Sequence, residues 1–409
     1  MTTTLSRLDS VDLTDLDLFA DGFPHELFSR MRAETPVRWN PSARADGFWS
    51  LTRADHIREV AQSPDRFSSA KGGVFLTRDT IAPLHAAQSW VLFQDPPQHS
   101  KYRDLVAQAF LPRSMIILEE EIKRAVKRTV DEVAGRGACD FVHDVAEPIA
   151  LRMIAQMMGA PDEDLPLIRG WVGAIGDALT NDTDCYDELR SMGEHLVSLV
   201  NKQIIRSVDS LACTMSQAEI DGERLDEAGI ALYFAALVWA GVHPMAHAIA
   251  GGMLALMQHP DQLEALRANP ANLRLRRSGL TPPAIEEILR YTSAVNYLSR
   301  TATQDTTIGG TAIKSGDRVV MWFAAGNRDP ELFPNPDTFD TERPLEGGEH
   351  LAFSAGPHRC QGAFLANRLL STALTESIQR LPGIEVAGSY GWERSNFFTA
   401  LTTLPVRFQ

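Results

Sequence analysis

The stretch FSAGPHRCQG, residues 353–362, places a single cysteine among residues that permit an unusual backbone, directly before an apolar helical pattern. Gly356 and Gly362 allow a tight turn and the close approach of a flat ring system. Backbone amides at the start of the next helix can hydrogen-bond the sulfur of Cys360 and favour its thiolate form. A lone cysteine is more often a small buried hydrophobe. This ten-residue context predicts instead a heme-thiolate ligand, which donates electron density to iron and favours O–O cleavage.

The same stretch resembles the cysteine-ligand loop of the cytochrome P450 superfamily, and the resemblance extends over nearly the whole chain. The family's Phe, Gly, His or Arg, Cys and Gly positions are filled by Phe353, Gly356, His358, Cys360 and Gly362. The resemblance implies a mainly α fold of the bacterial soluble class, with a helical majority and a minor β region. It also implies one domain over residues 1–409, with heme b between a long central helix and the loop that carries its axial ligand, Cys360.

Composition and charge exclude several classes of protein. The chain has 409 residues, of which 44% are hydrophobic and 22% charged, enough for an extensive core. A formal net charge of -14 disfavours nonspecific nucleic-acid binding, which requires a basic face. No uninterrupted apolar run reaches the roughly 18 residues of a membrane span, and the Asp-rich start at 12–21 is unlike a signal peptide or an anchor. We therefore expect a soluble, cytoplasmic protein without a membrane anchor.

The cysteines indicate neither a zinc site nor a disulfide framework, because they are far apart and lack CxxC spacing. They are Cys139, Cys185, Cys213 and Cys360. We expect the first three to be structural.

Apolar periodicity predicts a mostly helical chain. After Asp95-Pro96-Pro97, helices are expected at roughly 98–110, 115–135, 143–159, 163–180 and 188–207. A long helix is expected from Leu225 to His259; its segment Ile230 to Val242 is apolar almost all round, as in a helix crossing the interior, and too short to span a membrane. A shorter helix is expected near 283–291, and strands at 47–52, 308–310 and 317–323.

Glu287 and Arg290 lie three residues apart on one helix face, where their side chains can pair. Alone, such a pair is usually solvated surface. The spacing resembles the family's ExxR motif, however, and Pro336, Phe339 and Arg343 resemble its PxxFxxxR segment. The resemblance implies that Arg343 joins the pair and that the three charged residues lock this segment beneath the heme, a structural role.

Four further residues are candidate partners of the heme propionates. His99 and Arg103 are four residues apart on one predicted helix and could both reach a propionate. Arg300 and His358 match the family's other propionate partners. Two propionates bring two charges into a mostly enclosed site, which requires cationic or hydrogen-bonding partners. Each residue alone would more often lie on the surface, but the four filled positions together predict propionate binding.

The long helix departs from the family pattern. Family members usually carry Ala-Gly-x-Asp/Glu-Thr, whose acid and alcohol relay protons to dioxygen. Here Ala240 and Gly241 keep the small residues that leave room for O2 and substrate, but His243 stands at the acid position and Pro244 at the alcohol position. In a regular helix Pro244 would clash with the carbonyl of Ala240 and cost about 3 kcal/mol. We interpret Pro244 as fixing a distortion already present in this helix, in preference to a direct catalytic role.

His243 and His247 are four residues apart and share a helix face, which also fits a metal pair or a proton shuttle. A second metal is disfavoured, because no carboxylate or third ligand lies near them in the sequence. His243 could replace the acid as an entry point for protons, or it could turn away and hydrogen-bond a neighbouring helix. The sequence leaves both possibilities open.

The resemblance implies a monooxygenase that receives NAD(P)H electrons through a ferredoxin reductase and a ferredoxin. Arg113, Arg359 and Arg368 are the expected ferredoxin contacts. The expected substrate is a small hydrophobic molecule such as a sterol, fatty acid or terpenoid, or an intermediate held by a carrier protein. The predominantly apolar segments expected to line its pocket are roughly 73–93, 171–179, 234–242, 295–298 and 397–399.

Two alternatives remain open from the sequence. The changed pair His243-Pro244 is compatible with peroxide-driven oxidation, or with coupling, desaturation or rearrangement in secondary metabolism. A catalytically silent heme-binding helper is disfavoured, because such helpers tend to lose the ligand or the propionate partners that this chain retains.

Overall fold

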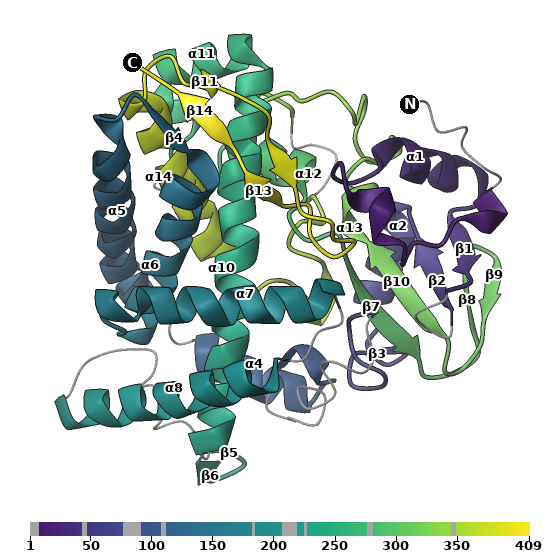
Figure 1. The fold of residues 1–409 in the computed structure, drawn as a ribbon. Coiled ribbons are helices and arrows are strands. Elements are labelled where there is room, and N and C mark those ends of the chain that lie inside the picture. Colours follow the sequence, from purple (N-terminus) through teal and green to yellow (C-terminus); the bar gives the residue numbers. More distant parts are fainter. Residues whose placement is uncertain are drawn as a thin grey trace.

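The computed structural model describes residues 8–42, 47–76, 91–107, 112–181, 185–206, 219–224, 227–275, 281–344 and 349–409. Over these ranges the chain is mainly helical, with its largest sheet gathered at one side (Figure 1), which confirms the predicted fold class. The helices are α1 (His25–Glu34), α2 (Ala54–Ala61), α4 (Gln98–Ala107), α5 (Pro112–Ala134), α6 (Glu147–Met158), α7 (Leu165–Asn181), α8 (Tyr186–Arg206), α10 (Glu227–Gln258), α11 (Pro260–Ala268), α12 (Pro283–Thr292), α13 (Phe323–Gly326) and α14 (Ala363–Arg380).

Helix α10 forms the centre of the helical part. It contacts α6, α7, α8, α12 and α14, and α7 and α8 cross it at a steep angle (Figure 1). From Met245 to Leu256 every residue except Gly251 is buried, as expected of a helix that is apolar all round. The segment Ala236–Gln258 is long and apolar enough to span a membrane, and 61% of its most apolar window is buried within the protein. The core helix of a soluble protein has the same length and composition.

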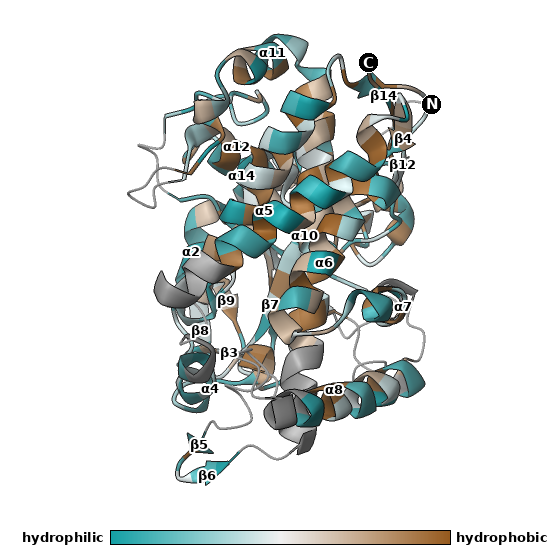
Figure 2. Cartoon of the chain, turned by 90° about the vertical axis from the view of Figure 1, so that its left-hand side faces the viewer, coloured by the Kyte–Doolittle hydropathy of each residue, from teal (hydrophilic) through white to brown (hydrophobic). Residues whose placement is uncertain are grey.

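Helix α5 shows why the outer helices pack as they do. Ile122, Val126, Val130 and Val133 recur at helical spacing and are buried, whereas the charged residues between them are mostly exposed. Figure 2 shows mostly hydrophilic residues on the outward side of this helix. Burial of the apolar stripe holds α5 against α6 and α14.

The main sheet joins segments that are far apart in the sequence. Strand β10 (Arg318–Trp322) is buried at every position and lies between β2 (Phe48–Leu51), to which it is parallel, and β7 (Tyr297–Ala302), to which it is antiparallel. The order of the sheet is β1-β2-β10-β7-β3, with β1 (Val37–Asn40) and β3 (Phe67–Ser68) at the edges.

Smaller sheets fix the C-terminal region. Three strands pair in the order β11-β14-β4, and the remaining strands form two-stranded ribbons. Their bounds are β4 (Ala138–Asp140), β5 (Glu219–Ile220), β6 (Glu223–Arg224), β8 (Thr306–Ile308), β9 (Thr311–Ile313), β11 (Glu385–Val386), β12 (Gly391–Trp392), β13 (Leu401–Thr403) and β14 (Pro405–Arg407). The β12–β13 ribbon leads into residues 393–400, which run beside α10.

The predicted helices are confirmed, with differences at their ends. The expected helix 143–159 begins at Glu147, because Phe141–Ala146 forms a π-helical turn before Pro148. The predicted strands at 47–52 and 317–323 contain β2 and β10. At 308–310 the predicted strand ends early: Ile308 closes β8, and Gly309 and Gly310 form the turn with φ of 53° and 80°.

Candidate functional site

The predicted pair on α12 is a buried ionic cluster. Arg290 donates from Nε and Nη2 to the two carboxylate oxygens of Glu287, at 2.7 and 2.8 Å, and Arg343 donates from Nε to the same carboxylate at 3.0 Å. The Glu287 side chain is 1% exposed. Two guanidiniums on one buried carboxylate exclude the interpretation of Glu287 and Arg290 as a solvated surface pair.

The guanidiniums also bind the Pro- and Asp-rich segment that precedes the cysteine loop. Arg290 donates to the carbonyls of Asn327 at 2.8 Å and Pro336 at 2.7 Å, and Arg343 donates to those of Pro334 at 2.6 Å and Thr338 at 2.7 Å. Because this segment has little regular structure, these bonds satisfy carbonyls that no helix or strand pairs.

Asn327 connects this ionic cluster to the cysteine loop. The residue is fully buried, and its side-chain oxygen accepts a hydrogen bond of 2.6 Å from the Leu351 amide. The Leu351 carbonyl accepts in turn from the Ser354 amide at 2.8 Å, at the start of the loop. Neither Asn327 nor Ser354 was singled out from the sequence, since no motif connects residues that lie on separate loops.

The cysteine loop has the tight geometry that its sequence predicts. The Cys360 amide donates to the Phe353 carbonyl at 2.8 Å, which closes the turn. Gly356 has a φ of 68°, and a Cβ there would overlap the Ala61 carbonyl oxygen at the end of α2, so glycine is required. Gly362 differs from the expectation: its φ of -81° suits any residue, so the turn itself does not require a glycine there.

The protein alone favours the protonated thiol of Cys360. Although Cys360 is exposed at the surface of its loop, desolvation by the surrounding protein raises the pKa of its thiol, and the Gly362 amide with the charges of Arg103 and Arg359 only partly offsets the rise. The amide therefore acts in the predicted direction, but its effect is smaller than that of desolvation. A metal ligand must be deprotonated, so binding of iron by this sulfur would be coupled to proton release.

Three predicted propionate partners, His99, Arg300 and His358, lie together in a cluster behind the loop. His99 and Arg300 are each 2% exposed, and the rings of His99 and His358 lie 4.0 Å apart. Burial, with the charges of Arg103 and Arg300, lowers the pKa of His99 to about 4. Burial also lowers the pKa of Arg300 to about 10, with only Asp95 acting in the opposite direction.

These residues fit a dianionic group such as heme. Nη2 of Arg300 and Nδ1 of His99 are buried without a hydrogen-bond partner, and among the described residues no carboxylate forms an ion pair with Arg300. A buried guanidinium without an anion is strongly unfavourable. Gln361, next to Cys360, donates to the carbonyl of Arg103 at 2.8 Å, so the cluster and the cysteine loop are joined. Heme propionates beside Arg300 and His99, with iron at Cys360, would satisfy both sets of groups.

Two residues beside the cluster were not identified as site residues from the sequence. The hydroxyl of Ser69 lies 3.2 Å from Nε2 of His358, and the Ser69 amide donates to Asp95 at 2.7 Å. A lone serine after a short strand gives no signal of such a position. Asp95 precedes two prolines and lies three residues before α4 begins, so it could have been noticed as part of the approach to that helix.

On α10, Ala240 and Gly241 have different surroundings. Ala240 is exposed and Pro244, one turn later, is half-buried on the same side of the helix. Gly241 faces α6, where a Cβ would lie 3.1 Å from Cγ1 of Ile154 and closer still to its Cδ1. This glycine therefore permits close packing of α10 on α6, a role that the sequence did not indicate, and its part in leaving room for O2 stays a prediction.

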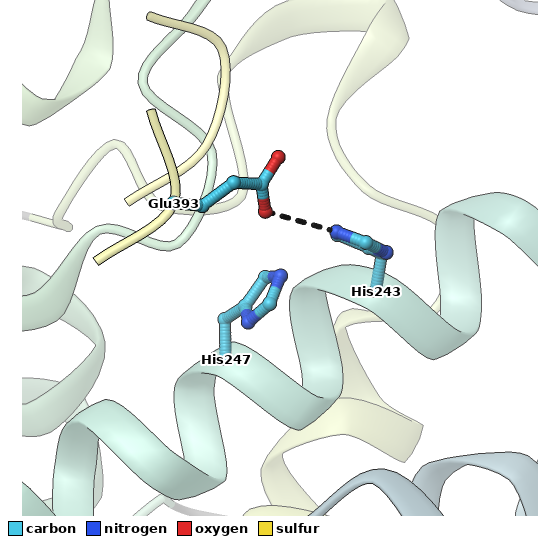
Figure 3. Close-up of side chains that lie close together, drawn as sticks. All are labelled: His243, His247 and Glu393. Atoms are coloured by element: carbon cyan, nitrogen blue, oxygen red, sulfur yellow. Dashed lines mark hydrogen bonds and ion pairs between the residues drawn. The ribbon is translucent and has the colours of Figure 1, made fainter. Parts of the chain in front are cut away.

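His243 turns toward the C-terminal segment, and its ring also lies against Gly176 of α7, where a Cβ would be 3.3 Å from Cε1 of His243. Its Nε2 lies 3.4 Å from a carboxylate oxygen of Glu393, and its ring lies 4.6 Å from that of Phe398 (Figure 3). This arrangement resembles the second of the two possibilities left open by the sequence, with a loop carboxylate in place of a neighbouring helix. A second metal was disfavoured because no third ligand lies near the two histidines in the sequence, and the fold brings Glu393 to them from a distant part of the chain.

Aromatic side chains from three predicted pocket segments meet beside α10. The ring of Phe75 lies 5.6 Å from that of Trp239 and 5.1 Å from that of Phe397, and Trp239 and Phe397 are stacked at 5.9 Å. Edge-to-face and stacked rings of this kind form a rigid apolar wall. Residues 77–90, which were also expected to line the pocket, lie outside the described residues, as do the side chains of 231–235.

The cytochrome P450 family model matches residues 150–382. The chain belongs to this family. Members are heme monooxygenases whose iron is bound by a cysteine thiolate, and the buried Arg300 and the cysteine loop agree with this chemistry. The methyl-branched lipid omega-hydroxylase of Mycobacterium tuberculosis is 32% identical, over 97% of this chain and 94% of that protein. The steroid C26-monooxygenase of Rhodococcus jostii is 30% identical, over 98% of this chain and 85% of that protein.

The fold agrees with solved P450 structures over almost its full length. A cytochrome P450 of Mycobacterium marinum in complex with pseudoionone superimposes with a TM-score of 0.88 at 30% identity, covering 99% of this chain and 100% of that chain. The chain is thus a bacterial-type P450 monooxygenase.

The Glu287 cluster generates a stability prediction. Replacing Glu287 by Gln (E287Q) removes the one negative charge that faces two buried guanidiniums, and we expect a loss of about 3–5 kcal/mol in the free energy of unfolding. Chemical denaturation measures this loss, and heme absorbance per protein should fall with it. The matched control is E264Q, because Glu264 pairs with Arg267 at the same i,i+3 spacing but is 64% exposed. The control should change stability by less than about 0.5 kcal/mol; equal stability of the two variants would contradict the prediction.

Proposed function

We propose that this P450 oxidises a hydrophobic small molecule with O2, using Cys360 as the axial ligand of heme b. His99, Arg103, Arg300 and His358 would hold the propionates, with Phe353 and Gly362 beside the ring. The observation that carries this proposal is the buried, unpaired Nη2 of Arg300 next to a cysteine loop of this geometry. When bound, the heme would activate dioxygen at an iron whose axial thiolate favours O–O cleavage.

We propose a lipid, steroid or terpenoid as the substrate class. The aromatic cluster of Phe75, Trp239 and Phe397 is itself buried, and it would form the rigid apolar backing of a pocket beside Ala240, which follows Trp239 on α10 and is exposed. The relatives are a lipid omega-hydroxylase and a steroid C26-monooxygenase, and a structural neighbour binds pseudoionone. Chain-terminal carbons of such molecules are the first positions to test.

Proton delivery in this chain cannot use the usual acid and alcohol. Pro244 has neither a hydroxyl nor an N–H group, and His243 is directed toward Glu393. We infer that protons reach the distal side from ordered water or from the substrate. The same observation favours a second candidate function, peroxide-driven oxidation, because peroxide already carries the protons and electrons that the relay and the redox chain would supply.

Electrons would arrive through a ferredoxin on the side of the cysteine loop. Arg359 is close to Glu349, at 3.6 Å, and Arg368 lies on α14, where its guanidinium stands 4.8 Å from the ring of Phe364. Phe364 is 37% exposed and the Arg359 side chain 43% exposed, whereas Arg368 is only 20% exposed and pairs with Glu119 at 2.5 Å, so a ferredoxin would compete with Glu119 for this guanidinium. The side chain of Arg113, the third expected contact, lies outside the described residues.

The ligand assignment predicts a spectroscopic result. C360S should abolish the red-shifted ferrous–CO band of a thiolate-bound heme, because a serine oxygen does not donate electron density as a thiolate does. C139S is the control and should keep the band, since Cys139 lies in β4. With the wild-type ferric protein, sterols, fatty acids and terpenoids should shift the Soret band. If C360S keeps the band, Cys360 is not the axial ligand. If none of the three classes shifts the Soret band, the substrate proposal is wrong.

The relay assignment predicts a gain of function. The double variant H243D/P244T restores an acid and an alcohol, and we expect redox-driven oxidation to rise by about tenfold or more relative to the peroxide-driven rate. The matched control H243D/P244A relieves the proline without adding a hydroxyl and should not show this rise. Turnover of the same ligand with either oxidant measures both rates, and equal ratios in the two variants would refute this account of the relay.

The ferredoxin surface predicts an effect of charge. Reversal of three charges in R113E/R359E/R368E should slow electron transfer from a reconstituted ferredoxin by about tenfold at low salt, and less at high salt. R190E is the control, because Arg190 is an exposed arginine on α8 that was not assigned to this surface. Stopped-flow reduction of the heme gives the rate. Unchanged rates in the triple variant would remove the proposed surface.

A further inference from the structure

Three side chains that can bind a metal converge between α10 and the C-terminal segment. His243 and His247 project from α10 toward Glu393, which follows β12 (Figure 3). One ligand atom from each of the three lies within 4.8 Å of the others. Ligands of a tetrahedral zinc ion stand about 3.4 Å apart, so a side-chain movement of about 1 Å would close the site.

His247 supplies an independent observation that a ligand is missing. Its side chain is 8% exposed, and both Nδ1 and Nε2 are buried without a hydrogen-bond partner. An unsatisfied buried polar group costs about 1–3 kcal/mol, so a histidine retained in this position requires another benefit. Its ring lies 4.4 Å from that of His243 and faces the same space. Burial, together with His243, holds the pKa of His247 well below its usual value.

The surroundings suit a cation. Glu393 provides a negative charge, and its backbone amide donates a hydrogen bond of 2.8 Å to the Ala400 carbonyl. The adjacent Arg394 pairs with Asp17 at 2.5 Å. The ring of Phe398 lies 4.6 Å from His243 and 5.8 Å from His247 and covers one side of the site.

We propose that His243, His247 and Glu393 bind a divalent transition-metal ion of the zinc class, separate from the heme iron. Two imidazoles at i and i+4 on a helix with one carboxylate from elsewhere form a donor set preferred by zinc, with a fourth position left for water. The bound ion would join α10 to the segment after β12, one residue away from Pro244. It would also occupy His243, which then could not deliver protons.

The proposal can be tested on the heme-loaded protein without substrate. After loosely bound metal is removed with a chelator that leaves heme in place, the protein is titrated calorimetrically with zinc ion, and its metal content is measured after gel filtration. We expect one zinc ion per chain in addition to the heme iron. H247L and E393Q should each weaken zinc binding by at least about tenfold, and zinc should raise the unfolding temperature of the wild type but not of these variants.

The matched control is H143L. His143 and Glu147 form an i,i+4 pair at 3.3 Å on the surface, and removing it should leave zinc binding unchanged. The ferrous–CO spectrum reports whether each variant is folded. No zinc uptake by the wild type, or equal uptake by folded H247L and E393Q, would overturn the proposal. Because no turnover is measured, this inference does not rest on the proposed function, and the two can fail separately.

Discussion

One buried carboxylate organises the region below the heme site. Glu287 faces Arg290 and Arg343 at distances of 2.7 to 3.0 Å, and those guanidiniums bind backbone carbonyls of a segment with little regular structure. Because neither the carboxylate nor the guanidiniums are tolerated alone at this depth, the ions and the chain path depend on one another. Through Asn327 the arrangement extends to the loop that carries Cys360.

The opposite constraint governs the propionate side, where the protein buries the guanidinium of Arg300 without an ion-paired carboxylate among the described residues. Arg300 retains an unpaired nitrogen, and the tilted rings of His99 and His358 lie 4.0 Å apart in the same region. This part of the fold is therefore incomplete as protein alone, and its stability is expected to depend on a bound dianion. Heme would thus act as a structural component as well as the reactive group.

The distal side of α10 shows how a change in two residues can redirect a site. Pro244 removes the alcohol, and His243 leaves the acid position to meet Glu393. Gly241 packs against Ile154 of α6. Of the three motif residues Ala240, Gly241 and Pro244, only Ala240 and Pro244 therefore lie on the side of α10 that faces away from Ile154. A helix that keeps its place in the fold can therefore lose one proton path and acquire a different cluster of side chains.

The sequence by itself determined the fold class, the helix positions and the cysteine loop, because helical periodicity and the glycine at 356 are local properties of the chain. The Glu287 cluster could also be found, since its motifs have fixed spacing, and the binding of propionates by His99, Arg103, Arg300 and His358 stays a prediction. Only the tertiary structure decided that His243 and His247 meet Glu393, that Gly241 packs on α6, and that Asn327 connects two loops. Those contacts join residues far apart in the chain, and their geometry depends on how helices and loops pack after they have formed.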